Sequence, residues 1–351
     1  MKKIIYLFSI LAAVTSCLKD DVKVAKEYQI DFRISVDSKA AETTSTDISG
    51  FVVSAFDSKG NAYFKNVEFE KVEGYDYFTA KDQYYYWPAD KELTFFAYYP
   101  AMDNVSADVE NGALVLKNFT VADNMSDHKD VVIAKQTEKY SENGTILEFE
   151  HCLSQIQIMA KNDNEGYVYR VKGVKIGKPA SSGDYNFNDF QWVAASDEEK
   201  RLFITEYDEC IELDGTLKDL MGESGNAMLL PQQLVGWDPV NDAKNANDNS
   251  YLSLLINLKT SGGTPIYPAV DKEALTDVDD EDPYAWIAVP LNTEWEAGYK
   301  YIYHLDFTSG SGFIDPDEEG AGESVLSNPV KFTVEAVKDW SSPETVVTPE
   351  I

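Results

Sequence analysis

The sequence contains few of the residues from which metal, redox and nucleophilic sites are built. Its 351 residues include only three cysteines and three histidines. It has no G-x-S-x-G, H-E-x-x-H, P-loop or G-x-G-x-x-G motif. Carboxylates are too numerous for one pair to stand out as the acid and base of a glycosidase. We therefore expect no catalytic residue and no cofactor, and the protein is not expected to be an enzyme.

The three histidines fall in different patterns. His151 shares a face with Phe149 and Leu153, so we expect it to be a core histidine with its polar atoms satisfied. His304 has the opposite parity from an alternating row of tyrosines and is expected at solvent or at a sheet edge. His128 lies in a polar stretch typical of a loop.

Cysteine is also scarce. Cys152 and Cys210 are far apart in the sequence, and nothing in it fixes their geometry. They could pair in an oxidising compartment. We expect two buried thiols, and the sequence leaves the disulfide open.

The sequence also has few basic residues relative to acidic ones. The chain has 30 basic and 61 acidic residues, a formal net charge of -31. Such a field repels nucleic acid and anionic lipid, so no nucleic-acid partner is expected. Three loops are especially acidic, and none has the spacing of a known calcium loop. We expect these loops to be solvated surface without a metal: Asn241–Asn249, Asp277–Asp282 and Asp315–Glu323.

Long amphipathic helices are also missing, and strand patterns take their place. Apolar Tyr28, Ile30, Phe32, Ile34 and Val36 alternate with polar residues, which predicts a half-buried strand. Similar runs recur along the chain with Gly, Asn and Asp turns between them. This pattern is typical of β-sandwiches. The clearest further runs are Phe51–Phe56, Leu93–Tyr99, Val131–Ala134, Tyr167–Ile176, Leu252–Leu258, Trp286–Leu291, Tyr299–Phe307 and Val330–Ala336.

The length fits two sandwich domains. The apolar parity changes between Ile146 and Ala160, and we expect a β-bulge near Ser154 to restore a common face. The polar, turn-rich segment 161–166 is the best boundary. We therefore expect an N-terminal domain over 28–160 and a C-terminal domain over 167–351.

The first residues predict export and a lipid anchor. Lys2 and Lys3 precede an apolar run, Ile4–Val14, which is too short to span a bilayer of about 30 Å. Val14-Thr15-Ser16-Cys17 resembles the bacterial lipobox, which implies removal of residues 1–16 and acylation of Cys17, with palmitate among the chains. An ordinary secretory signal is the alternative.

Residues 17–27 then form an acidic tether. Within it, Leu18-Lys19-Asp20-Asp21 resembles the signal that sends some Bacteroidetes lipoproteins to the cell surface. We therefore expect an outer-membrane lipoprotein that faces outward.

Six segments, in order along the chain, resemble the fimbrillin superfamily of Bacteroidetes. The first contains Tyr86-Trp87-Pro88 followed by an aromatic strand that ends at Pro100. From the first to the last, the segments span most of the chain beyond Cys17. They are Tyr86–Pro100, Asp130–Ala134, Phe149–Ile156, Leu229–Gln232, Trp295–Tyr301 and Phe332–Trp340.

The resemblance implies an all-β protein with two transthyretin-like β-sandwich domains in tandem. It also implies a structural or anchor subunit of a type V pilus. In that family a trypsin-like, arginine-specific protease removes the first strand, and a strand from a neighbouring pilus subunit fills the groove by β-augmentation. The expected partners are thus other pilus subunits, the processing protease and the outer membrane.

This chain departs from the family at the expected cleavage site. Lys39 stands where an arginine is common, and Arg33 lies inside the predicted first strand, where pairing resists a protease. Both remain processing candidates, and an uncut subunit would be an anchor or a separate surface protein. The expected donor is Val330–Ile351.

A second function stays open. Tyr84-Tyr85-Tyr86-Trp87 could stack on sugars or partner proteins, although packing at a sandwich edge is the favoured interpretation. Tyr84 is the residue we expect to be exposed. The alternative function is an unprocessed surface lipoprotein that acts as an adhesin for a host glycan or protein. A third class, an extracellular hydrolase, lacks a catalytic constellation.

Overall fold

The structure of the protein is a computed structural model. It describes residues 28–36, 43–89, 91–102, 106–110, 113–140, 144–195, 200–269, 283–338 and 345–347. The predicted signal peptide, the tether with Cys17, and Lys39 lie outside the described residues.

The all-β class is confirmed. Within the described ranges, strands dominate, and the helical elements are the single 3-10 turns η1 (Met125–Asp127) and η2 (Gly222–Ser224). No helix in this part of the chain is long and apolar enough to cross a membrane.

The chain folds into two compact units whose boundary differs from the expected one. The first unit contains residues up to Ser35 together with Ser45–Ala101 and Ala134–Phe149. The second contains Val36–Thr44, Met102–Ile133 and Glu150–Ile351. The boundary expected at 161–166 is therefore corrected, because this turn connects two strands of the second unit.

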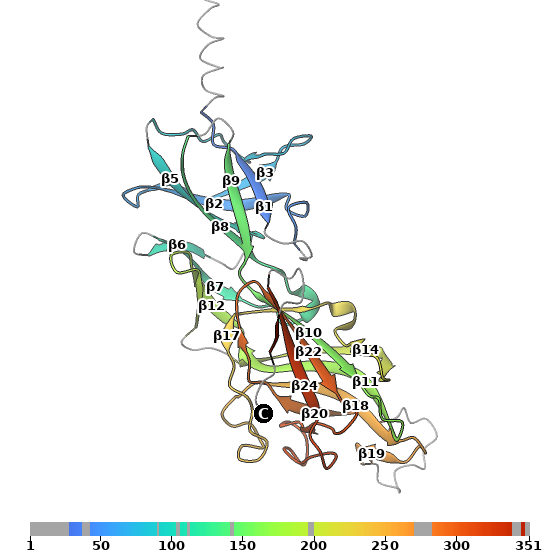
Figure 1. Cartoon of the computed structure of the whole chain (residues 1–351). Coiled ribbons are helices and arrows are strands. Elements are labelled where there is room, and N and C mark those ends of the chain that lie inside the picture. Colours follow the sequence, from blue (N-terminus) through green and yellow to red (C-terminus); the bar gives the residue numbers. More distant parts are fainter. Residues whose placement is uncertain are drawn as a thin grey trace, which may run out of the picture. The chain divides into compact units, whose positions relative to one another are not determined.

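In the first unit the strands are hydrogen-bonded in a closed order, β1-β4-β3-β2-β5-β8-β9. All of them except β4 are labelled in Figure 1. Because the order closes, β1 lies between β4 and β9. The bounds are β1 (Phe32–Val36), β2 (Gly50–Asp57), β3 (Ala62–Lys71), β4 (Phe78–Ala80), β5 (Glu92–Tyr99), β8 (Val132–Lys139) and β9 (Thr145–His151).

A cluster of phenylalanines forms the core of the first unit. Most of the ring pairs lie in edge or tilted contact with centroids 4.8 to 6.1 Å apart, an arrangement that aromatic quadrupoles favour, and Phe51 and Phe69 are stacked at 6.2 Å. The alternation of each strand places these side chains inside and its polar neighbours outside. The cluster contains Phe32, Phe51, Phe69, Phe78, Phe95 and Phe149.

The second unit contains two larger sheets and two smaller ones. The first large sheet has the order β15-β10-β22-β24-β25, with β16 also on β10: β10 (Ser154–Lys161), β15 (Lys218–Asp219), β16 (Ala227–Leu229), β22 (Tyr299–Asp306), β24 (Lys331–Lys338) and β25 (Thr345–Val347).

The second large sheet has the order β14-β11-β18-β20-β23, with β19 also on β18: β11 (Tyr167–Ala180), β14 (Lys200–Glu212), β18 (Tyr251–Thr260), β19 (Pro265–Tyr267), β20 (Ala285–Pro290) and β23 (Phe313–Ile314). The smaller sheets contain β6 (Ser106–Glu110), β7 (Ala113–Thr120), β12 (Ser182–Asn186), β13 (Gln191–Ala194), β17 (Gln232–Gln233) and β21 (Glu294–Trp295).

The second large sheet is covered on both faces at its centre. Nearly every residue of β18 from Tyr251 to Leu258 is buried, whereas a sheet with one wet face would alternate. Pairing places Val174, Leu254 and Ile287 side by side on one face. The other face carries Lys175, Ser253 and Ala288 in register. Lys175 is therefore buried on the face of the sheet that also carries Ser253 and Ala288.

The parity change between Ile146 and Ala160 has a different cause from the expected bulge. β9 ends at His151 and β10 begins at Ser154, and the two strands belong to different sheets. β10 pairs in parallel with β22, from Gln155 beside Lys300 to Lys161 beside Asp306. The chain thus passes from the barrel to a second sheet at the point where its apolar parity changes.

Candidate functional site

The predicted first strand completes the barrel of the first unit. Phe32 of β1 pairs with Phe78 of β4. Just before β1, the Ile30 N–H donates to the Tyr85 carbonyl at 2.9 Å, and the Trp87 N–H donates to the Tyr28 carbonyl at 2.8 Å. On the other side, the Thr145 N–H donates to the Asp31 carbonyl at 3.2 Å. Without this strand, backbone groups on both neighbours would lose their partners.

The side chains of this strand also fill the core. Ile30 and Phe32 are buried, while Arg33 and Ser35 are exposed, as the alternation predicts. The Phe32 ring is completely buried, 4.8 Å from Phe69 and 5.0 Å from Phe95 between centroids. Removal of residues 28–36 would therefore leave an apolar groove between β4 and β9.

The two processing candidates are placed differently. Arg33 lies within β1, so its backbone belongs to a paired strand, whereas its side chain is exposed. Lys39 lies in the segment 37–42, which the structure does not describe. Which of them is cut stays a prediction.

The expected donor region divides into two parts. β24 pairs with β22 over its whole length, from Lys331 beside Asp306 to Lys338 beside Tyr299. β25 pairs with the other side of β24 and lies at the end of the sheet order. β24 is thus an inner strand, and only the chain after Lys338 could leave without breaking the centre of the sheet.

The tyrosine segment has both an exposed and a packed part. Tyr84 has an exposed fraction of 63%, and Tyr86 is also exposed, whereas Trp87 is buried 5.5 Å from Phe95. The Tyr63 hydroxyl donates to the Tyr86 carbonyl at 2.6 Å. The exposure of Tyr84 agrees with expectation, and its role as a contact residue stays a prediction. We refer to the exposed residues Tyr28, Tyr63, Tyr84 and Tyr86 as the tyrosine surface.

A separate hollow of about 380 Å³ in the first unit carries charges of both signs. The hydrogen bonds from Asn61 hold the pKa of Asp57, one of its lining carboxyls, below the ordinary value. None of its lining residues belongs to the tyrosine surface. They are Asp57, Ser58, Lys59, Lys91, Glu92 and Lys139.

The three histidines are buried or half-buried, and each lies near a polar group of the protein. His151 is buried as expected of a core histidine, with Nδ1 2.8 Å from the Asp130 carboxylate. The expectation that all its polar atoms are satisfied is not met at the buried Nε2, which makes no hydrogen bond within the described part of the chain. His128 is half-buried, and its Nε2 lies 3.0 Å from the Ala122 carbonyl oxygen. His304 is half-buried 3.8 Å from Glu335.

The two cysteines are free. Cys152 is buried as expected, whereas Cys210 is exposed, so the expectation of two buried thiols is wrong for Cys210. It lies on β14, the end strand of its sheet order. Within the described ranges, no group of three or more His, Cys, Asp and Glu residues could hold a metal ion.

One buried polar cluster could not be expected from the sequence. Lys175 of β11 meets Asp315, the first residue of an acidic run that we expected to be solvated. That expectation is corrected for Asp315, which is completely buried. No sequence motif marks the pair because the two residues are separated by 140 positions.

Comparison with known proteins gives the family. Residues 33–328 match the model of a family described as fimbrillin-like. The chain belongs to the fimbrillin-like family. Residues 1–17 match the prokaryotic membrane lipoprotein lipid attachment site, which ends at Cys17. None of the curated proteins matches this chain.

Solved structures similar to this one include three candidate cell adhesion proteins. The one from Bacteroides uniformis is 14% identical, with 89% of this chain and 98% of that chain covered and a TM-score of 0.48. The one from Bacteroides ovatus is 15% identical, with 90% and 99% covered and a TM-score of 0.48. The one from Parabacteroides distasonis is 10% identical, with 90% and 98% covered and a TM-score of 0.49.

Proposed function

We infer that this fimbrillin-like protein is a structural or anchor subunit of a cell-surface fimbria that assembles by exchange of strands. The observation that carries this proposal is the position of β1 between β4 and β9, with Phe32 in the core. A cut in the segment 37–42 would separate residues 28–36 from the rest of the barrel in one continuous peptide. The groove left behind has open strand edges and an apolar floor. An incoming strand can form hydrogen bonds with these edges and bury its apolar side chains on this floor.

The donor is the C-terminal segment of a second subunit. β25 pairs with β24 at three positions, Thr345, Val346 and Val347, at the end of its sheet. Release of this segment leaves β24 paired with β22. The proposed donor is therefore shorter than the expected one and begins after Lys338.

The lipid on Cys17 holds the subunit at the outer membrane, facing outward. Two or more acyl chains give stable anchoring, because each buried CH₂ contributes about 0.8 kcal/mol. The lipid attachment site supports this location. A trypsin-like protease that accepts lysine would release the subunit at Lys39, whereas an uncut subunit would stay as an anchor.

The test replaces residues 37–42 of the full chain by the recognition sequence of a site-specific protease. After complete cleavage and loss of the released peptide, light scattering should show growth of polymers. The uncut variant is the matched control and should remain monomeric. Monomers that persist after complete cleavage would contradict the proposal.

The tyrosine surface favours a second candidate function, an adhesin for a glycan or a protein. Tyrosine rings offer apolar faces to sugars and a hydroxyl to polar groups. The test measures binding to a glycan panel and to host surface proteins. Tyr84→Ala should weaken any binding, whereas Tyr75→Ala, exposed outside the tyrosine surface, should not. A flat response of the unchanged protein across both panels would remove this candidate.

A further inference from the structure

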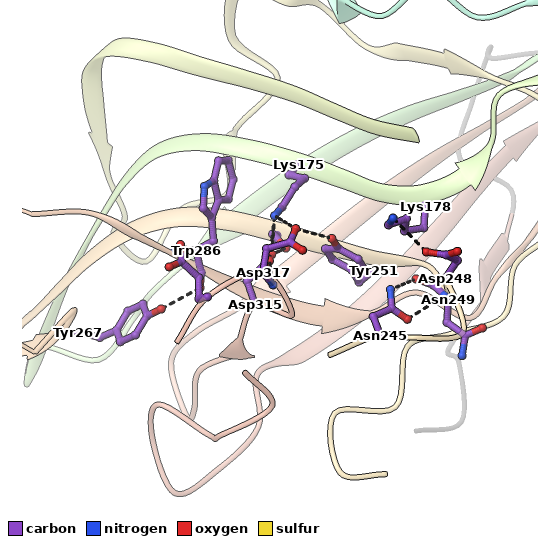
Figure 2. Close-up of polar contacts among 12 residues, drawn as sticks. Lys175, Lys178, Asn245, Asp248, Asn249, Tyr251, Tyr267, Trp286, Asp315 and Asp317 are labelled. Atoms are coloured by element: carbon purple, nitrogen blue, oxygen red, sulfur yellow. Dashed lines mark hydrogen bonds and ion pairs between the residues drawn. The ribbon is translucent and has the colours of Figure 1, made fainter. Parts of the chain in front are cut away.

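The second unit contains an ion pair that is almost completely shielded from water. The side chains of Lys175 and Asp315 are 4% and 0% exposed. The Lys175 Nζ lies 2.9 Å from both carboxylate oxygens of Asp315 (Figure 2). Both charged groups of such a pair lose their hydration, and the attraction between them only partly offsets the free-energy cost of burial.

Both groups are held in place by the backbone. Lys175 lies in the middle of β11, in register with Ser253 of β18. Asp315 directly follows β23, and its N–H donates to the Trp286 carbonyl of β20 at 3.2 Å. Lys175 is therefore fixed within a strand, and Asp315 is fixed by its position directly after β23 and by its hydrogen bond to β20.

The carboxyl oxygens of Asp315 receive two further hydrogen bonds. The Ser253 hydroxyl donates to Oδ2 at 2.5 Å. The Asp317 N–H donates to Oδ1 at 3.0 Å. Donors in these positions stabilise the negative charge that develops on a carboxyl oxygen when a nucleophile adds to its carbon.

Aromatic rings cover the pair. The Lys175 Nζ lies 5.0 Å from the centre of the Trp286 ring and 5.5 Å from that of Tyr251 (Figure 2). Tyr251 also packs with Trp237, Ala288 and Phe313 in a small apolar cluster. Burial, aided by the nearby carboxylates, raises the pKa of Tyr251, so its hydroxyl keeps its proton.

A second carboxylate connects the pair to solvent. The Asp317 Oδ2 lies 3.5 Å from the Lys175 Nζ, and the Tyr251 hydroxyl donates to the same oxygen at 3.5 Å. The Asp317 side chain is 60% exposed. Its carboxylate can therefore accept a proton from the buried amine.

We propose that Lys175 and Asp315 condense to an intramolecular isopeptide bond. A bond forms between the Lys175 Nζ and the Asp315 Cγ, and one Cγ–O bond breaks. Two of the three ammonium protons leave with that oxygen as water, and the third stays on the amide nitrogen. Asp317 relays a proton from the attacking nitrogen to the departing oxygen. The step needs no oxidant or cofactor.

The protein environment favours this condensation in two ways. Groups held in contact react as though their local concentration were about 10⁵ M or more. In bulk water the charged amine and carboxylate are favoured over the amide by hydration. Here both charges are already dehydrated, so the neutral amide removes the cost of their burial and releases one water molecule.

The bond would connect β11 to the segment after β23 and close a span of 140 residues. It would limit extension of the second unit under a pulling force, because β18 and β20 lie within the closed loop. The proposal is independent of strand exchange in the first unit.

The test is mass spectrometry of the full chain purified from the cell surface. Expected are an intact mass lower by one water molecule and, after trypsin, a branched peptide. Its arms are 173–200 and 301–331, since Lys175 is blocked and Pro179 protects Lys178. Separate linear peptides 173–175, 176–200 and 301–331, with trypsin cutting after a free Lys175, would overturn the proposal.

Three variants of the full chain sharpen the result. Lys175→Arg keeps the charge but removes the amine, so the full mass should return. Lys178→Arg is the matched control on the same strand, where Lys178 pairs with Asp248 at 3.0 Å, and it should keep the lower mass. Asp317→Asn should slow bond formation about 10²-fold, the effect of losing a positioned proton carrier. If Lys175→Arg does not fold, the peptide map of the unchanged chain still decides.

Discussion

Replacement of Phe32 by alanine tests whether β1 is held mainly by its core side chain. Phe32 is completely buried against Phe51, Phe69 and Phe95. Truncation of a buried phenylalanine typically lowers the free energy of unfolding by about 3–5 kcal/mol. The same loss applies to local opening of β1, because the open strand makes none of these contacts. Since about 1.4 kcal/mol is a factor of ten, the opening constant should rise by a factor of about 10² to 4 × 10³.

Amide hydrogen exchange measures this opening directly. The N–H groups of Ile30 and Trp87 are bonded across the strand, to the carbonyls of Tyr85 and Tyr28. Their exchange should accelerate by the predicted factor in Phe32→Ala. Ser35→Ala is the matched control, since Ser35 lies on the exposed face of β1, and should change stability by less than about 0.5 kcal/mol. Unchanged exchange at both amides in Phe32→Ala would refute the assignment of β1 as a strand held by Phe32.

Three further predictions concern the second unit. Burial raises the pKa of the Cys152 thiol, so a thiol reagent should label exposed Cys210 in the folded protein and Cys152 only after denaturation; rapid native labelling of Cys152 would contradict its burial. Burial lowers the pKa of His128, so the free energy of unfolding should fall as pH drops below about 6.5, where the unfolded histidine binds a proton that the folded one resists. The free energy of unfolding is measured by denaturation at about pH 7.5 and about pH 5.5, and His128→Gln should reduce the difference between the two values. The same difference in the variant and the unchanged protein would contradict the lowered pKa of His128. Gly177→Ala would push a methyl group into the Tyr251 ring and should cost about 1–3 kcal/mol in urea unfolding, whereas Gly262→Ala makes only an ordinary contact of 3.7 Å with the Thr260 hydroxyl oxygen and is the control; equal midpoints would contradict the packing of Gly177 against Tyr251.

The strand β1 could be predicted well because it buries one face only. Ile30 and Phe32 face inward while Arg33 and Ser35 face solvent, so period two is visible in the sequence. The domain boundary could not be predicted in the same way. A change of parity has the same local signature whether a strand bulges or crosses to another sheet, and the parallel pairing of β10 with β22 is not encoded near residue 150.

The buried pair of the second unit was missed for a related reason. Asp315 begins an acidic run whose composition is that of solvated surface, and Asp317 is indeed largely exposed. Asp315 differs because it contacts Lys175. The two residues are 140 positions apart in the sequence, and the pairing of β11, β18 and β20 brings them together. Cys210 shows the converse error, because an apolar residue on an edge strand need not be covered.

The alternation that identifies β1 also constrains any strand that replaces it. Ile30 and Phe32 occupy the core at every second position, so a donor shifted by one residue would place polar side chains there. After Lys338 the sequence ends with Val347, Pro349 and Ile351, which alternate with Thr348 and Glu350. A second copy therefore carries a period-two segment outside its own inner strands. Because a slip of one residue is costly, the register of exchange would be set by side chains, while the backbone edges of β4 and β9 supply the hydrogen bonds.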